Sequence, residues 1–254
     1  MKKQIQILAA TFITVAFVSC SKQDMQTIQT PVITGEEMPT SSSSSRPYVD
    51  PLTIALDARY TFDKHLKDVT NQQADGKPSS RGAAVYTYDR KGIANAALKF
   101  DKNYYVSIAN MPVQQKMSLS VWVKRATPYY NGASPIIRHN STGIALMQKE
   151  NGFWARVHDY LNSSSTTSII SNDFIDQAWH HIVITYAGEE MKMYVDNQLQ
   201  GNTSNTFAVV EGLTKYLLGY SHGNAGNYWE GVIDDLRFYG RTLSASDVQK
   251  LFNQ

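Results

Sequence analysis

The chain has 254 residues, of which 42% are hydrophobic and 11% aromatic, so it can bury the core of one large domain or two small ones. Its formal charge is +2, and Lys2 and Lys3 account for that excess. Because the other basic residues are scattered and balanced by acidic ones, the composition argues against nucleic acid or an acidic membrane surface as a partner.

The first twenty residues follow the plan of a secretory signal. The positive pair Lys2-Lys3 is followed by the apolar segment Ile5–Val18, and a small residue then precedes Cys20. The apolar segment is too short for a comfortable membrane span. It resembles the signal of a bacterial lipoprotein, although Phe17 stands where Leu is more usual. Residues 1–19 are therefore expected to be a lipoprotein signal peptide, with acyl chains such as palmitate on Cys20. An ordinary secretory signal with a coincidental cysteine is the alternative.

The stretch after the signal predicts a flexible tether. Residues 20–50 are rich in Ser, Thr, Gln and Pro and include the run Thr40–Ser45, a composition that cannot form a core. About thirty such residues have a root-mean-square reach on the order of 30 Å. Two or more acyl chains would anchor the protein stably, since each buried methylene contributes about 0.8 kcal/mol. The expected location is the cell envelope, with the lipid anchor as the only membrane contact, in the outer membrane and compatible with its outer surface.

Residues 51–254 read as short strands separated by turn residues at intervals of roughly ten, which predicts an all-β sandwich or barrel in one domain. Cys20 is the only cysteine, so no disulfide within the chain can hold this domain. The expected strands are 58–62, 84–88, 97–100, 105–108, 119–124, 135–138, 143–148, 153–160, 166–170, 182–186, 191–195, 215–218 and 231–239.

The most regular stretch is Trp179–Asp196, which predicts an antiparallel hairpin. Two runs rich in β-branched and aromatic residues, 182–186 and 191–195, flank the polar turn 187–190. The first run is apolar on both faces, so it is expected in the middle of a sheet that is covered on both sides.

One helix is expected, at the end of the chain. Ser244 followed by Asp247 predicts a capping box with Asp in place of Glu, and Val248, Leu251 and Phe252 give one apolar face. This helix is expected to dock against the edge or base of the sheet.

A set of short motifs, in order, resembles a known family over about Leu52 to Phe252. The motifs are Tyr60–Asp63, Asp89–Asp101, Leu119–Lys124, Trp179–Val183, Tyr194–Asp196 and Ile233–Ser244. They are similar to the laminin-G-like jelly-roll domains of the concanavalin A-like lectin/glucanase superfamily. Asn197 departs from that pattern, which usually has Gly there, but Asn also accepts left-handed backbone angles. The resemblance implies a jelly roll of two curved antiparallel sheets.

Catalytic interpretations find little support in the sequence. Retaining glycosidases need two carboxylates about 5 to 5.5 Å apart, and the Glu-x-Asp-x-x-Glu type of motif seen in the glucanase branch is absent. Glu189 and Glu190 lie in a turn where neighbouring side chains diverge, and Asp234 and Asp235 are expected on opposite faces of a strand. No Gly-x-Ser-x-Gly elbow occurs either.

Two interpretations concern metals. Adjacent His180 and His181 should face opposite ways in a strand, so they are expected to be packed, hydrogen-bonded histidines that share no ion. Asp234 is expected to face inward, like Leu236 and Phe238, and a buried carboxylate needs donors or a cation. The resemblance implies that calcium can lie between early and late segments of the domain, so a possible Ca²⁺ site comprises Asp63, Asp68, Asn71 and Asp234. Capping of backbone amides by Asp234 is the alternative.

The strongest binding signal is the strand 153–160. If its apolar positions face the core, a period of two places Trp154, Arg156, His158 and Tyr160 on the outer face. Flat rings beside planar donors suit the apolar faces and hydroxyl edges of sugars. Two loops carry further candidates, Tyr130 in the turn 128–132 and Trp229 after the segment 222–228. The alternative is that Trp154 and Tyr160 only cover the second sheet.

These features lead to three hypotheses. The first is a membrane-anchored, non-catalytic carbohydrate-binding module whose ligand is a glycan or glycoprotein. The second is an adhesive or structural subunit of the envelope that binds a protein partner through the same surface or a sheet edge. A glycoside hydrolase is the third, and it has the least support because no paired catalytic carboxylate motif is present.

Overall fold

A computed structural model describes residues 48–127, 130–161, 165–171, 174, 176–204, 207–221 and 227–254. The predicted signal peptide, Cys20 and most of the predicted tether lie outside the described residues. The part from Tyr48 to Gln254 is one structural unit. Within the described residues, no helix is both long and apolar enough to cross a membrane.

The described chain forms a sandwich of two sheets, as the spacing of the predicted strands and turns indicated. The eight-stranded sheet has the order β13-β12-β11-β6-β15-β4-β3, with β1 also paired to β15. Its strands are β1 (Leu56–Tyr60), β3 (Val85–Thr87), β4 (Ala97–Asp101), β6 (Met117–Arg125), β11 (Trp179–Tyr186), β12 (Glu190–Val195), β13 (Gln198–Ser204) and β15 (Glu230–Tyr239). β11 lies inside this sheet between β12 and β6, which confirms the central position predicted for the hairpin.

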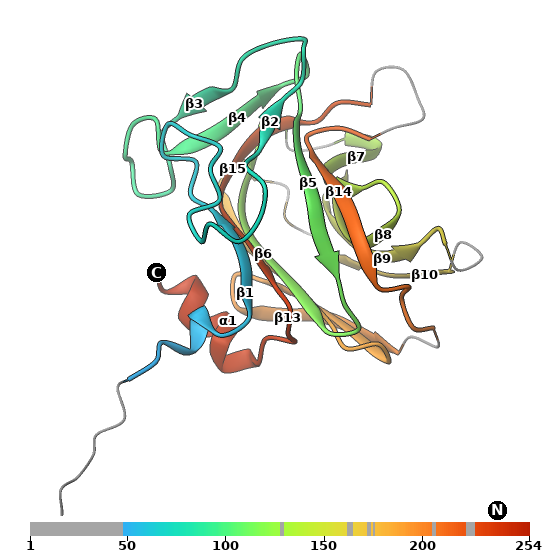
Figure 1. Cartoon of the computed structure of the whole chain (residues 1–254). Coiled ribbons are helices and arrows are strands. Elements are labelled where there is room, and N and C mark those ends of the chain that lie inside the picture. Colours follow the sequence, from blue (N-terminus) through green and yellow to red (C-terminus); the bar gives the residue numbers. More distant parts are fainter. Residues whose placement is uncertain are drawn as a thin grey trace, which may run out of the picture. The chain divides into compact units, whose positions relative to one another are not determined.

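The seven-stranded sheet has the order β10-β9-β8-β7-β14-β5-β2. Its strands are β2 (Lys77–Pro78), β5 (Val106–Val113), β7 (Tyr130–His139), β8 (Thr142–Glu150), β9 (Gly152–Asp159), β10 (Ser165–Ser171) and β14 (Gly212–Leu218). Figure 1 shows the two layers, with β6 and β15 in one and β5 and β14 in the other. Every pairing between the named strands of the described part is antiparallel, so the predicted all-β jelly-roll class is confirmed.

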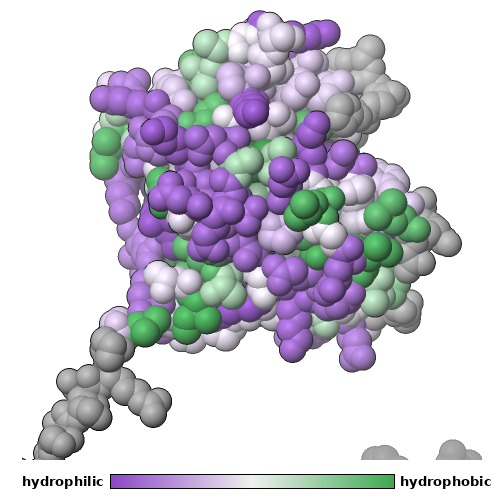
Figure 2. Space-filling view, viewed as in Figure 1, coloured by the Kyte–Doolittle hydropathy of each residue, from purple (hydrophilic) through white to green (hydrophobic). Residues whose placement is uncertain are grey.

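The core lies between the sheets and draws on both of them. Ile182 and Ile184 of β11 face Phe153, Ala155 and Val157 of β9 across one cluster in which these side chains are buried. Side chains alternate between the two faces of a strand. Since the odd-numbered residues 153, 155 and 157 of β9 face the core, its even-numbered residues face away from it. On the face seen in Figure 2, hydrophilic residues predominate and the apolar patches are small and separate.

The C-terminal helix α1 (Ala245–Phe252) covers the outer face of the eight-stranded sheet and not its edge or base. Ser244 and Asp247 form the predicted capping box. Val248 and Leu251 pack with Val183 of β11 in a second buried cluster, which also includes Leu52 of the 3₁₀ helix η1 (Pro51–Thr53). Figure 1 shows α1 beside η1 and β1. The helix supplies the cover that the apolar outer face of β11 needs.

Candidate functional site

The outer face of β9 carries the row predicted from the sequence. Trp154 and Arg156 are half-buried, Tyr160 is 44% exposed and His158 is buried. On β8, the small residues Ala145 and Gly143 pair with Arg156 and His158, so no large side chain of β8 lies beside these two residues. The name β9 face is used below for the set Trp154, Arg156, His158 and Tyr160 together with Arg138 of β7.

Trp154 contacts two cations. The guanidinium carbon of Arg156 lies 4.6 Å from the ring centroid of Trp154, and Nζ of Lys149 lies 4.9 Å from it. Cations at this distance are attracted to the negative face of an indole. The ring of Trp154 therefore gathers positive charge, and less of its surface is open to stack on a sugar than the sequence suggested.

Tyr160 joins the row to Arg138. A guanidinium N–H of Arg138 donates a hydrogen bond to the phenol oxygen of Tyr160. The rings of His158 and Tyr160 lie with their centroids 3.8 Å apart. These contacts hold Tyr160 at one end of the β9 face although its side chain remains partly exposed.

A small hollow opens at this end of the face. Its volume is about 150 Å³, and it is lined by Arg138, His139, Asn140, Tyr160 and Ser221. A second, wider depression of about 420 Å³ adjoins it through Asn140 and is lined in part by Leu161 and Leu213. Ligand pockets usually measure about 300 to 1,000 Å³. The hollow alone therefore suits one substituent of a ligand, while the rest of the ligand would lie on the open face or in the wider depression.

The charges on this face are all positive among its described residues. Burial, followed by the positive charge of Arg138, lowers the pKa of His139 to about 3. Burial also lowers the pKa of His158, helped by Arg156 and Arg138. Both imidazoles are therefore neutral near pH 7, while the arginines keep their charge.

The carboxylate nearest in sequence, Asp159, is engaged elsewhere. It accepts hydrogen bonds from Oγ1 of Thr142 and from the backbone N–H of Val210, each at 2.7 Å. Several polar atoms of the β9 face, in contrast, are enclosed without a hydrogen-bond partner in the described part: Trp154 Nε1, Arg156 Nε and His158 Nδ1.

Trp229 does not belong to this face, contrary to the sequence-based expectation. Its side chain is only 1% exposed, and Nε1 donates a 3.0 Å hydrogen bond to Oε1 of Gln148 inside the sandwich. A Cβ on Gly231 would lie 2.3 Å from the indole, so the missing side chain there makes room for the ring. The side chain of Tyr130 lies outside the described residues, and so does the loop 222–226.

The four residues of the predicted calcium site are not brought together. Asp68 accepts hydrogen bonds from the backbone N–H groups of four residues, Arg59, Thr70, Gln72 and Gln73. Asp234 instead contacts Arg90 at 2.5 Å, and it shares only a pocket of about 180 Å³ with Asp63. No group of three or more His, Cys, Asp or Glu side chains in the described part is arranged to hold a metal ion.

Asp234 and Asp235 lie on the same face of β15, and neither faces the core. The pairing of β15 with β6 shifts register between Asp234 and Arg237, and Asp235 has a φ of 45°. This bulge breaks the alternation, so that Ile233 and Leu236 both reach the core while Arg90 contacts both carboxylates. The expectation that Asp234 points inward, with Asp235 opposite, is therefore wrong.

The carboxylates of this network are paired with arginines in ways typical of a structural cluster. Burial raises the pKa of Asp234 to about 7 despite the opposing charge of Arg90. Asp235 binds Nε and a terminal nitrogen of Arg237 at 3.1 and 2.7 Å and Nε of Arg59 at 2.9 Å. Burial opposes ionisation of Asp235 too, but the bonds and charges of Arg237 and Arg59 outweigh it and lower its pKa. A pair with divergent pKa values can mark acid-base catalysis, but here both oxygens of Asp235 are already occupied by guanidinium groups.

The two histidines of β11 face opposite ways, as predicted. His180 hydrogen-bonds to Asp196 and Asp176, each at 2.7 Å. On the other face, Nε2 of His181 lies 2.8 Å from Oγ of Ser120, and its ring stacks beside Trp122. Both are packed, hydrogen-bonded histidines.

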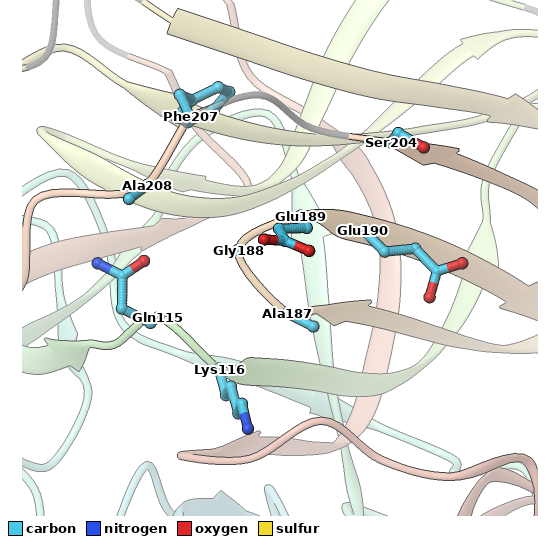
Figure 3. A pocket seen from close by; sticks show the side chains of 9 residues that line it. All are labelled: Gln115, Lys116, Ala187, Gly188, Glu189, Glu190, Ser204, Phe207 and Ala208. Carbon is cyan, nitrogen blue, oxygen red and sulfur yellow. The ribbon is translucent and has the colours of Figure 1, made fainter.

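A cleft of about 820 Å³ lies at the β11–β12 turn. Figure 3 shows the side chains of Glu189 and Glu190 pointing away from each other there. Glu190 binds Lys192 at 2.7 Å, and that hydrogen bond lowers the pKa of Glu190. The turn therefore presents no convergent carboxylate pair of the kind that glycoside hydrolysis uses.

Comparison with known families agrees with this architecture. Residues 100–249 match the Laminin_G_3 family, described as the concanavalin A-like lectin/glucanases superfamily. The match covers more than half of the chain, and the chain belongs to this family. A search of curated proteins found no match.

Solved structures with the same fold include several binding domains. Domain 4 of AbnA, an extracellular arabinanase from Geobacillus stearothermophilus, in complex with arabinotriose, is 18% identical with a TM-score of 0.61; the match covers 77% of this chain and 97% of that one. The botulinum neurotoxin serotype D ligand binding domain in complex with N-acetylneuraminic acid is 14% identical with a TM-score of 0.62, over 78% of this chain and 50% of that one.

A third structure is the binding domain of botulinum neurotoxin DC in complex with rat synaptotagmin II. It is 16% identical with a TM-score of 0.61, and the match covers 78% of this chain and 51% of that one. This chain thus spans about half the length of the toxin binding domains that it matches. At these identities the likeness shows the fold.

Proposed function

We propose that this protein is a non-catalytic carbohydrate-binding module that a lipid on Cys20 anchors in the cell envelope, and that it binds its glycan on the β9 face. The observation that carries the proposal is the outward row of rings and donors. Trp154 and Arg156 are half-buried and Tyr160 is 44% exposed, so rings and a guanidinium group remain partly accessible on this face. Flat rings beside planar donors favour a ligand with apolar faces and with hydroxyl or acidic groups.

The relatives support a glycan as the ligand. One structural neighbour was solved with arabinotriose and another with N-acetylneuraminic acid. Each is a domain of the same fold, and neither is described as catalytic by itself. The family to which the chain belongs is named for both lectins and glucanases, and the β9 face supplies rings and donors without a pair of carboxylates.

The test uses two exposed tyrosines, one beside each sheet. Tyr160 is 44% exposed on the β9 face, and Tyr88 is 64% exposed just after β3 of the other sheet. Affinity electrophoresis of the purified protein through gels containing soluble glycans should show retardation that Tyr160→Ala loses and Tyr88→Ala keeps. Equal retardation of wild type, Tyr160→Ala and Trp154→Ala would exclude the β9 face as the binding surface.

The anchor is tested separately. Cells that express the protein and are fed labelled palmitate should incorporate the label into the wild type but not into Cys20→Ala. The wild type should sediment with outer membranes, while Cys20→Ala should be released from them. Incorporation of label into Cys20→Ala would contradict the proposed site of acylation.

A protein partner is the second candidate function. Leu161 and Leu213, which line the wider depression, are 65% and 66% exposed. Apolar side chains that cluster at a depression favour protein contacts. A pull-down from envelope extracts separates the two candidates, because a protein partner would still be captured after exhaustive deglycosylation and a glycan would not.

A further inference from the structure

The β9 face holds an excess of positive charge that the described protein does not neutralise. Arg138, Lys149 and Arg156 all reach this side of the seven-stranded sheet, and none of them forms an ion pair within the described part. On the other sheet, by contrast, Arg59 and Arg237 are both paired with Asp235.

The cations of the face lie close enough to repel each other. After burial, the charge of Arg138 is the main influence that lowers the pKa of Arg156. Ile137 pairs with Leu146 on β8, which places Arg138 beside Ala145, and Ala145 pairs with Arg156 on the far side. Two strand spacings separate the arginine backbones by about 10 Å, and the methyl group of Ala145 fills little of that gap.

Aromatic rings, not carboxylates, hold these cations in place. Arg156 and Lys149 lie over Trp154, and Arg138 donates to Tyr160. Rings orient the guanidinium groups but leave their charge uncompensated. A planar guanidinium binds carboxylate or sulfate through two parallel hydrogen bonds. The gap over Ala145 could therefore accept an anionic group between two such forks.

A neutral sugar fits this surface less well. It needs an open aromatic face, and two cations already lie over Trp154. It also needs acceptors for its hydroxyl protons, whereas the guanidinium groups of Arg138 and Arg156 can only donate. The face therefore offers donors and positive charge, which complement an anion.

We infer that the glycan bound on the β9 face is acidic, carrying carboxylate or sulfate groups that lie between Arg138 and Arg156. This inference rests on the proposed function and narrows it to a class of ligand. Uronate and sulfate share the recognised chemistry, a planar or tetrahedral oxyanion on a sugar ring.

The experiment compares three soluble probes with the purified full-length protein: polygalacturonate, heparin and neutral dextran. We expect binding to one or both acidic polymers, weakening steeply as salt is raised, and little binding to dextran. The two acidic arms distinguish carboxylate from sulfate. A single-stranded oligonucleotide serves as a competitor, and if it bound more tightly than either acidic polymer, it would overturn the assignment to a glycan.

Charge-matched variants locate the contact. Arg156→Gln and Arg138→Gln should each weaken acidic-polymer binding at least tenfold, because hydrogen bonds to charged groups are strong. Lys91→Gln removes the same charge from an exposed position in the turn between β3 and β4 and should leave binding nearly unchanged. Arg156→Lys keeps the charge without the planar fork, and it should retain the salt dependence while losing affinity. Thermal melting of each variant establishes that it is folded.

The outcomes separate this inference from the proposed function. If dextran or another neutral glycan binds and Tyr160→Ala abolishes that binding, while the acidic polymers do not bind, the inference falls and the proposed function stands. If no glycan binds, both fall. If acidic polymers bind but Lys91→Gln weakens the complex as much as Arg156→Gln does, net charge and not this face is responsible, and the inference is overturned.

Discussion

Replacing Asp235 by Asn should destabilise the domain by several kilocalories per mole. The carboxylate is 8% exposed and binds Arg237, which is 4% exposed, through two hydrogen bonds of 3.1 and 2.7 Å. It also binds Arg59 at 2.9 Å and lies 3.8 Å from Arg90. The substitution leaves these guanidinium groups without their central anion, and the buried Arg237 would then keep the neutral amide oxygen of Gln254 as a partner but lose its carboxylate.

The expected magnitude follows from that burial. Breaking a buried ion pair by removing one partner costs about 3 to 5 kcal/mol, because the remaining charge is left uncompensated. A domain of this kind has a total stability of about 5 to 15 kcal/mol. Asn is the right replacement because Asp235 has a φ of 45°, a left-handed backbone that Asn tolerates and Ala does not. The change thus tests the charge and not the bulge.

The assay is urea unfolding at pH 7, followed by circular dichroism, with Glu190→Gln as the control. Glu190 and Lys192 form an equally short ion pair of 2.7 Å, but their side chains are 41% and 34% exposed, respectively. Exposed pairs contribute at most about 1 kcal/mol, so the control should unfold almost as the wild type does. If Asp235→Asn loses no more than the control, the network does not stabilise the fold in the way argued.

Two further predictions concern buried groups. Because burial lowers the pKa of His139 to about 3, only the unfolded chain takes up a proton at this position as pH falls below about 6.5, and stability is lost on acidification. Between pH 7 and pH 5 the wild type should therefore lose roughly 2 kcal/mol more than His139→Gln does in urea titrations; parallel losses would contradict this. Gly231→Ala would place a Cβ 2.3 Å from the ring of Trp229 and 2.6 Å from the carbonyl oxygen of Lys124. It should cost about 1 to 3 kcal/mol and alter tryptophan fluorescence, whereas Gly82→Ala, whose new methyl group would lie 3.6 Å from Cβ of Tyr104, should do neither. Equal stability of the two variants would show that Trp229 can move to accommodate the methyl group.

The sequence was most informative where the physical cause is local. Alternation of apolar and polar residues places Phe153 and Val157 in the core and Trp154 and Arg156 outside it. The capping box at Ser244 was likewise readable, because both of its hydrogen bonds lie within one turn. The strands β2 and β13 were missed, since Lys77–Pro78 and Gln198–Ser204 are short or polar and are recruited by their neighbours.

Errors arose where one residue changed the phase of a strand or one glycine opened a space. The bulge at Asp235 places Asp234 on the face opposite the one predicted. The prediction that its carboxylate faces the core is therefore wrong. Trp229 was expected in a loop, but Gly231 makes room for it inside the sandwich. Neither effect has a signature in hydrophobic periodicity: the bulge depends on the register between β15 and β6, and the burial of Trp229 depends on the space at Gly231 and on the bond to Gln148.

The amino-acid sequence by itself determined the class of fold, the single hairpin that occupies the middle of one sheet, and the identity of the side chains that project from β9. These follow from alternation and turn chemistry, which act between residues close in the chain. Only the tertiary structure decided that Arg138 joins Arg156 across β8, that Trp154 is occupied by cations, and that α1 covers β11. Such contacts join residues far apart in sequence. They depend on the register of strand pairing and on which apolar sheet faces would be exposed to water once the sheets have formed.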